Sequence, residues 1–191
     1  RCRGERMIVG PRETVRALWE SVRGWHVAPR LVRDRQLVMM IDRVRLRRYE
    51  RRAAVRPATI HEWSAVADSS AQMIAQELAC DPQRGSAEFI AGIRQMIERK
   101  LWWVAGTGGE LCFFCHAGPR CKQTIQLQGI WTPPRLRGRG LATASLAAIC
   151  DRLLETSPTL SLYVNDFNDA AIALYRRVGF EHVGDFQTIL F

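Results

Sequence analysis

The chain has 191 residues, of which 47% are hydrophobic, so it can bury a core and is not a disordered polymer. No apolar run approaches the roughly 18 residues of a membrane span, and no basic stretch leads into a secretory apolar core, so we expect a cytoplasmic protein without a membrane partner. The six cysteines are too few and too unevenly spaced for a disulfide scaffold, and we expect reduced thiols.

The net charge of +9 is concentrated in the first part of the chain. Residues 1–56 hold 16 arginines against six acidic residues, whereas the rest holds 12 basic and 13 acidic residues. This change predicts a boundary, which we place between residues 52 and 53. The densest arginines could bind nucleic acid through phosphate contacts, but no helix-turn-helix or metal finger accompanies them, so we favour a solvated connecting segment. They are Arg43, Arg45, Arg47, Arg48, Arg51, Arg52 and Arg56.

Before this boundary the pattern predicts one helix and one strand. Pro11 suits the first position of a helix over residues 11–22, whose apolar side chains recur at helical spacing and which Gly24 can end. Residues 37–41 form the predicted strand. One helix and one strand are a poor core for about 50 residues. Since the chain also begins at Arg1 rather than methionine, we expect residues 1–52 to be the tail of an incomplete preceding domain followed by a linker.

After the boundary the hydrophobic pattern predicts a regular series of elements in the order β-α-α-β-β-β-α-β-α-β. Thr59 with Glu62 forms a capping box that opens the first of these helices, and Ser86 can cap the second. Gly129 interrupts the alternation of the fourth strand, which indicates a bulge. The strands are expected at 54–57, 101–105, 111–117, 124–132, 160–164 and 180–191, and the helices at about 60–78, 87–97, 138–154 and 168–178.

A glycine-containing loop joins the strand at 124–132 to the helix that follows it. Its sequence is Pro134-Arg135-Leu136-Arg137-Gly138-Arg139-Gly140-Leu141-Ala142. The two glycines let a ligand approach the backbone, and the free amides of residues 137–141 open the helix as an anion site. Three arginines add positive charge, so the loop suits a phosphorylated ligand. A mononucleotide-binding loop would end in Gly-Lys-Ser/Thr, and a dinucleotide loop would need a third small residue and a continuous apolar strand before it.

A second motif, Cys112-Phe113-Phe114-Cys115-His116, matches the Cys-x-x-Cys-His pattern of a haem attachment site. With Cys121 it also resembles a metal knuckle. In a regular strand, residues three apart point to opposite faces, so Cys112 and Cys115 cannot share one ligand there. Cytochrome maturation also requires export, for which we find no signal. We therefore interpret these cysteines as small apolar residues of the core and expect no metal.

Downstream of the glycine loop lies the segment Asn168-Asp169-Ala170-Ala171-Ile172-Ala173-Leu174-Tyr175-Arg176-Arg177-Val178-Gly179-Phe180. Together with the loop, it resembles the GNAT superfamily of N-acetyltransferases. The superfamily's acetyl-CoA loop, Gln/Arg-x-x-Gly-x-Gly/Ala, is matched by Arg135, Gly138 and Gly140. Its later segment, Asn-x-x-Ala-x-x-Leu-Tyr-x-x-x-Gly-Phe, is matched at every position, by Asn168, Ala171, Leu174, Tyr175, Gly179 and Phe180.

The resemblance extends from about residue 54 to residue 191. It implies a layered α/β fold with a mixed, mostly antiparallel central sheet, helices on both faces, and a cleft where the strands at 124–132 and 160–164 splay apart. Residues 160–191 look like a bacterial subgroup of predicted acetyltransferases in which a second, N-terminal domain precedes the catalytic one. Residues 7–12 resemble the later part of that leading domain. The resemblance therefore places the N-acetyltransferase domain at 53–191, after the incomplete domain expected for residues 1–52.

In this resemblance acetyl-CoA is the co-substrate. Its pantetheine arm would bind the backbone of Ile130, Trp131 and Thr132, and would also contact Asn168. Tyr175, two helical turns beyond Asn168 on the same helix face, would protonate the departing thiolate as general acid. The pyrophosphate would be held by Arg135, Leu136, Arg137, Gly138, Arg139, Gly140 and Leu141, with Ala142 and Thr143 beside them.

The reaction implied is direct attack of a primary amine on the acetyl carbonyl, and a base must take the proton that the amine carries at neutral pH. Many members of the superfamily use a glutamate on the strand that corresponds to 124–132. Here Gln126 and Gln128 stand there, and an amide is no base. Glu77 on the first helix and His116 on the strand at 111–117 are the nearest alternatives, unless ordered water suffices.

Three functions follow from these patterns. The first is an acetyl-CoA-dependent N-acetyltransferase whose amine acceptor, a small molecule or a protein, the sequence does not identify. The second is a catalytically idle module that binds acetyl-CoA as a sensor; the absent carboxylate on the strand at 124–132 favours it and the intact Tyr175 opposes it. The third, which we rank last, is nucleic-acid binding through the arginine-rich N-terminal segment.

Overall fold

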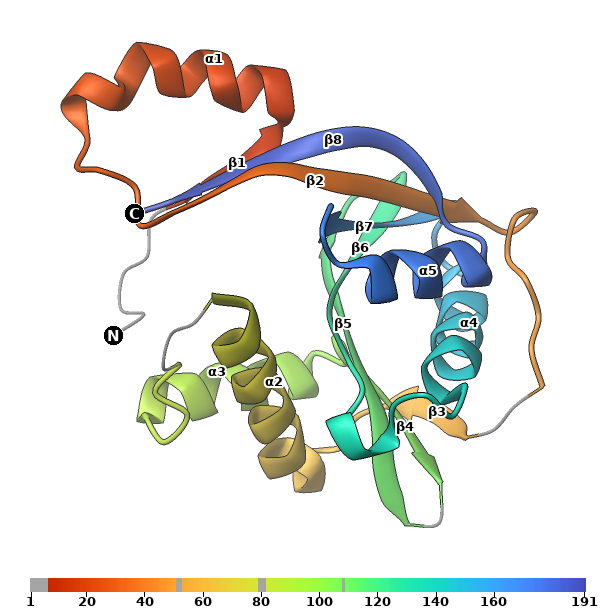
Figure 1. The fold of residues 1–191 in the computed structure, drawn as a ribbon. Coiled ribbons are helices and arrows are strands. Elements are labelled where there is room, and N and C mark those ends of the chain that lie inside the picture. The colour runs from red at the N-terminus through yellow and green to blue at the C-terminus, as the bar shows by residue number, and fades with distance from the viewer. Residues whose placement is uncertain (1–6, 51–52, 79–81, 108) are drawn as a thin grey trace.

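A computed structural model describes residues 7–50, 53–78, 82–107 and 109–191, and in this part of the chain eight strands form one sheet (Figure 1). The order of the strands is β1-β8-β2-β7-β6-β5-β4-β3. Every neighbouring pair is antiparallel except β6 with β7, which is parallel. The mixed, mostly antiparallel sheet is thereby confirmed. The strands are β1 Met7–Pro11, β2 Leu31–Asp42, β3 Ala54–Pro57, β4 Trp102–Thr107, β5 Glu110–Arg120, β6 Thr124–Trp131, β7 Thr159–Asn165 and β8 Glu181–Leu190.

Local capping signals place the helices where the sequence predicts them. Thr59 and Glu62 form the expected capping box, and the Ser86 hydroxyl accepts a hydrogen bond from the backbone N–H of Phe89 at 3.1 Å. Gly24 does not end the first helix directly, because a 3₁₀ turn at Arg23–Trp25 continues it. The helices are α1 Arg12–Val22, α2 Trp63–Leu78, α3 Ala87–Glu98, α4 Leu141–Leu153 and α5 Asp169–Val178, with further 3₁₀ turns at Ile60–Glu62 and Pro134–Leu136.

Helices lie on both faces of the sheet (Figure 1), and the described residues form one hydrophobic core on each face. The larger packs α4 and α5 against β2, β5 and β7, and the smaller packs α2 and α3 against β4 and β5. The neighbours Phe113 and Phe114 on β5 show the alternation of a strand, since Phe113 belongs to the larger core and Phe114 to the smaller. Helices therefore cover both faces, as the layered α/β fold requires.

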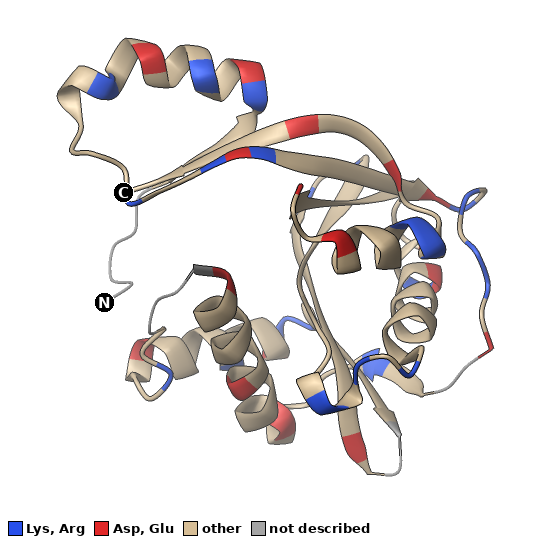
Figure 2. Ribbon diagram, viewed as in Figure 1, with Lys and Arg blue, Asp and Glu red and all other residues tan. Residues whose placement is uncertain are grey.

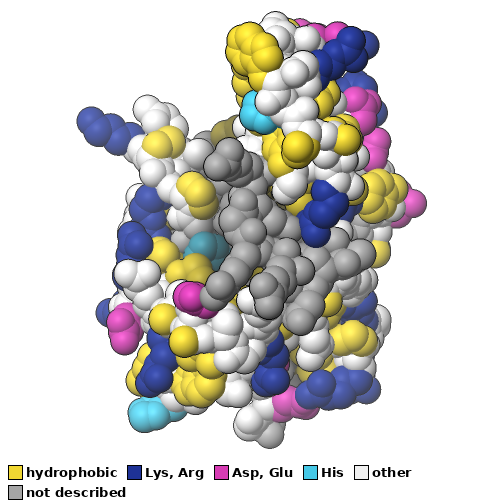
Figure 3. Space-filling model, turned by 90° about the vertical axis from the view of Figure 1, so that its left-hand side faces the viewer, with side chains coloured by type: hydrophobic (Ala, Val, Ile, Leu, Met, Phe, Trp, Pro, Cys, Tyr) yellow, Lys and Arg dark blue, Asp and Glu magenta, His cyan; other side chains and the backbone are white. Residues whose placement is uncertain are grey.

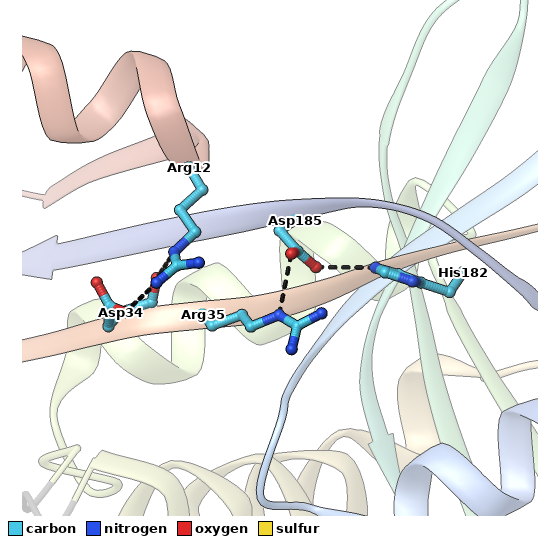
Figure 4. Close-up of polar contacts among 5 residues, drawn as sticks. All are labelled: Arg12, Asp34, Arg35, His182 and Asp185. Atoms are coloured by element: carbon cyan, nitrogen blue, oxygen red, sulfur yellow. Dashed lines mark hydrogen bonds and ion pairs between the residues drawn. The ribbon is translucent and has the colours of Figure 1, made fainter.

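The N-terminal part of the chain contributes strands to this same sheet. β2 lies between β8 and β7, and β1 pairs with β8 at the sheet edge. Figure 4 shows polar contacts that hold this region: Arg12 with Asp34, and Arg35 Nε with Asp185 at 2.9 Å. The sheet thus runs across the predicted boundary at residue 52. That residues 1–52 derive from a preceding domain stays a prediction.

The arginine-rich segment is held to the body of the protein by ion pairs. Arg43 pairs with Asp151, Arg45 pairs with Asp42 and with Glu181, and Arg56 pairs with Glu62. Figure 2 shows the basic residues along the connection from β2 to β3. That this segment serves as a solvated connection stays a prediction. Cys2, Cys80, Arg51 and Arg52 lie outside the described residues.

The cysteines of the Cys112–His116 motif are core residues, but their geometry differs from the expectation. Cys112 and Cys115 are fully buried and both belong to the larger core, not to opposite faces. The reason is a register shift between β4 and β5, which leaves Cys112 without a partner opposite it. Among the described residues no group of three or more His, Cys, Asp or Glu side chains could hold a metal ion.

Apolar side chains are exposed on and near α1, among them Leu18 and Trp25. Figure 3 shows hydrophobic side chains at the top of the molecule. Of the helices in the described ranges, none has both the length and the apolar character that crossing a membrane requires.

Candidate active site

The strands β6 and β7 diverge and open a cleft between them. They pair in parallel only at their first three positions, from Thr124 with Thr159 to Gln126 with Ser161. Gly129 adopts a positive φ of 57°, and the register between β5 and β6 shifts beside it. This confirms the bulge expected there, and glycine adopts such a backbone more readily than residues with a side chain. A Cβ at position 129 would also stand 2.9 Å from the Trp102 ring, so the bulge leaves no room for a side chain.

The cleft has a volume of about 1010 Å³ and is lined by α2, β6, the glycine loop, β7 and α5. This volume lies at the upper end of the range typical of small-molecule sites. All but one of the residues predicted to hold the coenzyme line it. They are Ile130, Trp131, Thr132, Leu136, Arg137, Gly138, Arg139, Gly140, Leu141, Ala142, Thr143 and Asn168.

The glycine loop presents backbone N–H groups at the start of α4. Gly138 and Gly140 have positive φ angles of 76° and 73°, and Gly140 is the N-cap of the helix. The first N–H groups of any helix have no partner within it, so they can bind an anion. Arg137 is anchored nearby, because its Nε donates to the carbonyl of Thr132 at 3.0 Å and its guanidinium lies 4.6 Å from the Trp131 ring centre. The loop is therefore built around fixed positive charge.

Arg135 is the predicted coenzyme residue that the structure places elsewhere. Its guanidinium forms an ion pair with Glu110, at the β4–β5 hairpin, and it does not line the cleft. Arg135 thus matches the motif in sequence, but its guanidinium is paired with Glu110 outside the cleft.

Tyr175 lies in the cleft wall on α5, with 7% of its surface exposed. Burial raises the pKa of Tyr175, and the negative charge of Glu77 adds to this effect. The phenol therefore stays protonated at neutral pH. Asn168 also lines the cleft, and its Oδ1 accepts a hydrogen bond from the backbone N–H of Ala171 at 3.2 Å. Asn168 thus caps α5, and its side-chain amide N–H groups remain to bind a ligand.

The two candidate bases lie in different places. Glu77, at the end of α2, lines the cleft. The surrounding protein raises the pKa of Glu77 by desolvation, although Arg33 opposes the shift. His116 does not line the cleft; its ring lies 5.2 Å from that of Trp102, and burial lowers its pKa while a hydrogen bond to Gln128 opposes that shift. Of the two, only Glu77 is positioned to meet a substrate.

The charge of Glu77 affects two tyrosines of the cleft. Its charge contributes to the raised pKa of Tyr163 on β7 as well as to that of Tyr175, with burial the larger cause in both. Arg33 on β2 donates to the Glu77 backbone carbonyl and stands 5.3 Å from the Phe167 ring centre. Glu77 and both tyrosines line the same cleft.

Several residues that line the cleft were not predicted from the sequence, because they come from distant segments. Gln36 on β2 donates to Asn165 Oδ1 on β7 at 3.0 Å, and both line the cleft. Tyr49 and Glu50 reach it from the connection between β2 and β3, and Arg177 reaches it from α5. No local motif marks Gln36, Tyr49 or Glu50, since their approach to the cleft depends on the pairing of β2 in the sheet.

Comparison with known proteins agrees with this architecture. The model of the acetyltransferase (GNAT) family matches residues 66–180. A mycothiol acetyltransferase from Acidimicrobium ferrooxidans is 38% identical over 95 residues, which cover 44% of this chain and 30% of that protein. The chain therefore spans less than a third of this curated relative.

Solved structures share the fold at low identity. A GNAT-family acetyltransferase from Colwellia psychrerythraea superposes with a TM-score of 0.67 at 14% identity, over 97% of this chain and 64% of that one. A predicted acetyltransferase from Clostridium acetobutylicum, solved with acetyl-CoA, has a TM-score of 0.53 at 15% identity, over 69% of this chain and 91% of that one. At such identities the likeness concerns the fold alone.

Proposed function

The chain belongs to the GNAT acetyltransferase family, and we propose that it transfers the acetyl group of acetyl-CoA directly to a primary amine. One observation carries the proposal: a single cleft combines a helix N-terminus opened by two glycines, a splayed strand pair, a buried tyrosine and a carboxylate. The first two features suit the coenzyme and the last two suit proton transfer. The thioester supplies an activated acetyl group, and the protein supplies binding, orientation and proton transfer.

The fit of the coenzyme rests on groups that the fold leaves available. The N–H groups of the first turn of α4, with Arg137 and Arg139 beside them, suit a pyrophosphate. Beyond the bulge β6 no longer pairs with β7, so its backbone N–H and carbonyl groups can bond the amide groups of a pantetheine arm. The Thr132 carbonyl already accepts from Arg137 but keeps a second lone pair, so the backbone contacts proposed are those of Ile130, Trp131 and Thr132.

Glu77 acts as the general base in this proposal. The amine is an ammonium ion at neutral pH and must lose a proton before its nitrogen can attack the carbonyl carbon and form the C–N bond. A carboxylate with a raised pKa is a stronger base than an ordinary one. Glu77 lies on α2 and lines the cleft. In this proposal it supplies the base that Gln126 and Gln128, on the strand where other members of the superfamily have a glutamate, cannot supply. The acceptor amine would thus approach from the α2 side of the cleft.

Tyr175 acts as the general acid. When the C–S bond breaks, the leaving sulfur carries the electron pair and needs a proton. The buried Tyr175 hydroxyl holds its proton at neutral pH and delivers it to that sulfur, after which solvent restores the phenol. The nitrogen loses a second proton as the amide forms, which offsets the proton that Tyr175 gives to sulfur, so acetylation of one ammonium group releases one proton to solvent.

The test begins with binding and continues with turnover. Acetyl-CoA should raise the melting temperature by mass action, and turnover should then be measured against a panel of amines. One curated relative is named a mycothiol acetyltransferase, so amines related to mycothiol belong in the panel beside polyamines and lysine peptides. If acetyl-CoA binds tightly and no amine supports turnover, the sensor function replaces the enzyme. If acetyl-CoA does not bind, both are overturned.

A further inference from the structure

The connection from β2 to β3 runs along the outer side of α4 and α5 (Figure 1). Its residues 45–50, which we call the strap, follow the C-terminal end of α5. The backbone of Arg45 packs directly on Gly179, and the N–H of Arg47 donates to the carbonyl of Val178 at 3.0 Å. The strap is therefore fixed to the helix through backbone contacts, which do not depend on the flexible arginine side chains.

Tyr49 continues these contacts and brings the strap to the cleft. Its hydroxyl donates to the carbonyl of Arg177 at 2.7 Å, which fixes the orientation of the ring. Tyr49 and Glu50 both line the cleft, and 40% of the Tyr49 surface is exposed. An aromatic side chain held in place and open to solvent offers a flat face on which a planar ligand group can stack.

Arg177 stands beside Tyr49 at the end of a stripe on α5. Ala170, Leu174 and Arg177 follow each other at helical spacing, and all three line the cleft. The hydrogen bond from Tyr49 uses the backbone of Arg177 and not its guanidinium. The neighbouring Arg176 lines a separate cavity of about 530 Å³ together with Arg45 and Arg47 of the strap, so of these two arginines it is Arg177 that lines the cleft.

We propose that the strap and Arg177 form the seat for the 3′-phosphorylated adenosine end of the coenzyme. The proposal rests on the proposed function, which assigns the thioester to Tyr175 and the pyrophosphate to the start of α4. The adenosine end then remains for the outer part of the cleft. The Tyr49 ring stacks on the adenine, Arg177 pairs with the 3′-phosphate, and the Glu50 carboxylate accepts from the adenine amino group.

The test compares dissociation constants by calorimetry for acetyl-CoA, 3′-dephospho-acetyl-CoA and S-acetyl-pantetheine. The wild type should bind acetyl-CoA about 10-fold more tightly than the dephospho form, as a charge-assisted hydrogen bond to phosphate predicts. Arg177→Gln should abolish this preference, and the matched control Arg176→Gln should keep it. Tyr49→Ala should weaken both adenosine-containing ligands about 10-fold and leave S-acetyl-pantetheine unchanged. Tyr49→Phe should retain most of the affinity, because it retains the ring.

Three results would overturn the proposal. Equal binding of acetyl-CoA and its dephospho form by the wild type would show that the 3′-phosphate is not held. Equal effects of Arg176→Gln and Arg177→Gln would show that the preference for acetyl-CoA over the dephospho form comes from the overall positive charge and not from a specific contact with Arg177. If Tyr49→Ala weakened the binding of all three ligands equally, Tyr49 would stabilise the cleft as a whole and would not contact the adenosine. In each case acetyl-CoA still binds the wild type, so the proposed function stands, whereas failure of the wild type to bind it overturns both.

Discussion

Arg45 and Gly179 are in backbone contact, so close that a Cβ at position 179 would stand 2.9 Å from the carbonyl carbon of Arg45 and closer still to its oxygen. Gly179 also ends α5 with a positive φ of 119°, and its N–H donates to the carbonyl of Tyr175. The glycine of the Gly-Phe pair therefore meets two constraints, a left-handed helix end and the passage of the strap.

Gly179→Ala should lower the free energy of unfolding by about 3 kcal/mol, because it adds both backbone strain and a steric clash. Urea unfolding followed by circular dichroism measures the change. Gly92→Ala in the middle of α3 is the control, since a Cβ there meets no atom within 4 Å, and it should be neutral or stabilise by up to about 1 kcal/mol. Similar stability for the two variants would contradict the contact.

Tyr175→Phe should lower kcat while it preserves the affinity for acetyl-CoA. The substitution removes the proton donor and keeps the ring that packs in the cleft wall, 6.0 Å from the ring of Phe180. A positioned acid contributes about 10²- to 10⁴-fold, so kcat should fall by that factor. Steady-state kinetics and calorimetry give the two quantities. A parallel loss of rate and affinity would make Tyr175 a binding residue instead.

Glu77→Gln should remove the acidic limb of the pH profile of kcat/KM. The carboxylate is the active form, so the wild-type rate should rise with pH through the pKa of Glu77, which lies above the ordinary glutamate value. In the variant the rate should fall about 10²- to 10⁴-fold and lose that limb. Glu98→Gln, on the exposed last residue of α3, serves as the control. An unchanged limb in Glu77→Gln would assign it to another group.

Gly138→Leu should abolish the thermal stabilisation by acetyl-CoA. A Cβ at position 138 meets no atom within 4 Å, and because Gly138 lines the cleft, a side chain there would occupy space that the pyrophosphate needs. Gly109→Leu is a matched control, since Gly109 also has a positive φ with open space but lies at the β4–β5 hairpin. At a ligand concentration of 100 Kd the wild type and the control should gain about 2.7 kcal/mol. The same gain in Gly138→Leu would move the pyrophosphate elsewhere.

Glu62→Gln should destabilise the protein at neutral pH by about 1 kcal/mol. Hydrogen bonds from Arg56, at 2.7 Å, and from Thr59 lower the pKa of Glu62 to about 2. A lowered pKa in the folded state gives stability that is present above the ordinary value of 4.5 and lost as the pH falls toward 2. The two proteins should therefore converge in urea unfolding near pH 2. The pair Glu62→Gln, Arg56→Gln should lose less than the sum of the single losses.

The sequence by itself determined the elements whose signals are local. The capping box at Thr59 and Glu62, the Ser86 cap and the bulge at Gly129 are each specified by residues within one turn or one strand, so they form where the pattern predicts them. The glycine loop belongs to the same class, because two glycines before a helix present N–H groups whatever the remainder of the chain does.

Only the tertiary structure decided which distant segments complete the site. β2 enters the sheet between β7 and β8, and this brings Gln36 into the cleft and leads the strap past α5. Strand pairing of this kind depends on packing over more than 100 residues of separation, which no local pattern encodes. The same packing placed Glu77 in the cleft and kept His116 out of it, although both were equal candidates for the base. It also kept Arg135 out of the cleft, although Arg135 matches the coenzyme motif. The two motifs thus indicated the chemistry, and the packing of two cores on one sheet decided which residues line the cleft.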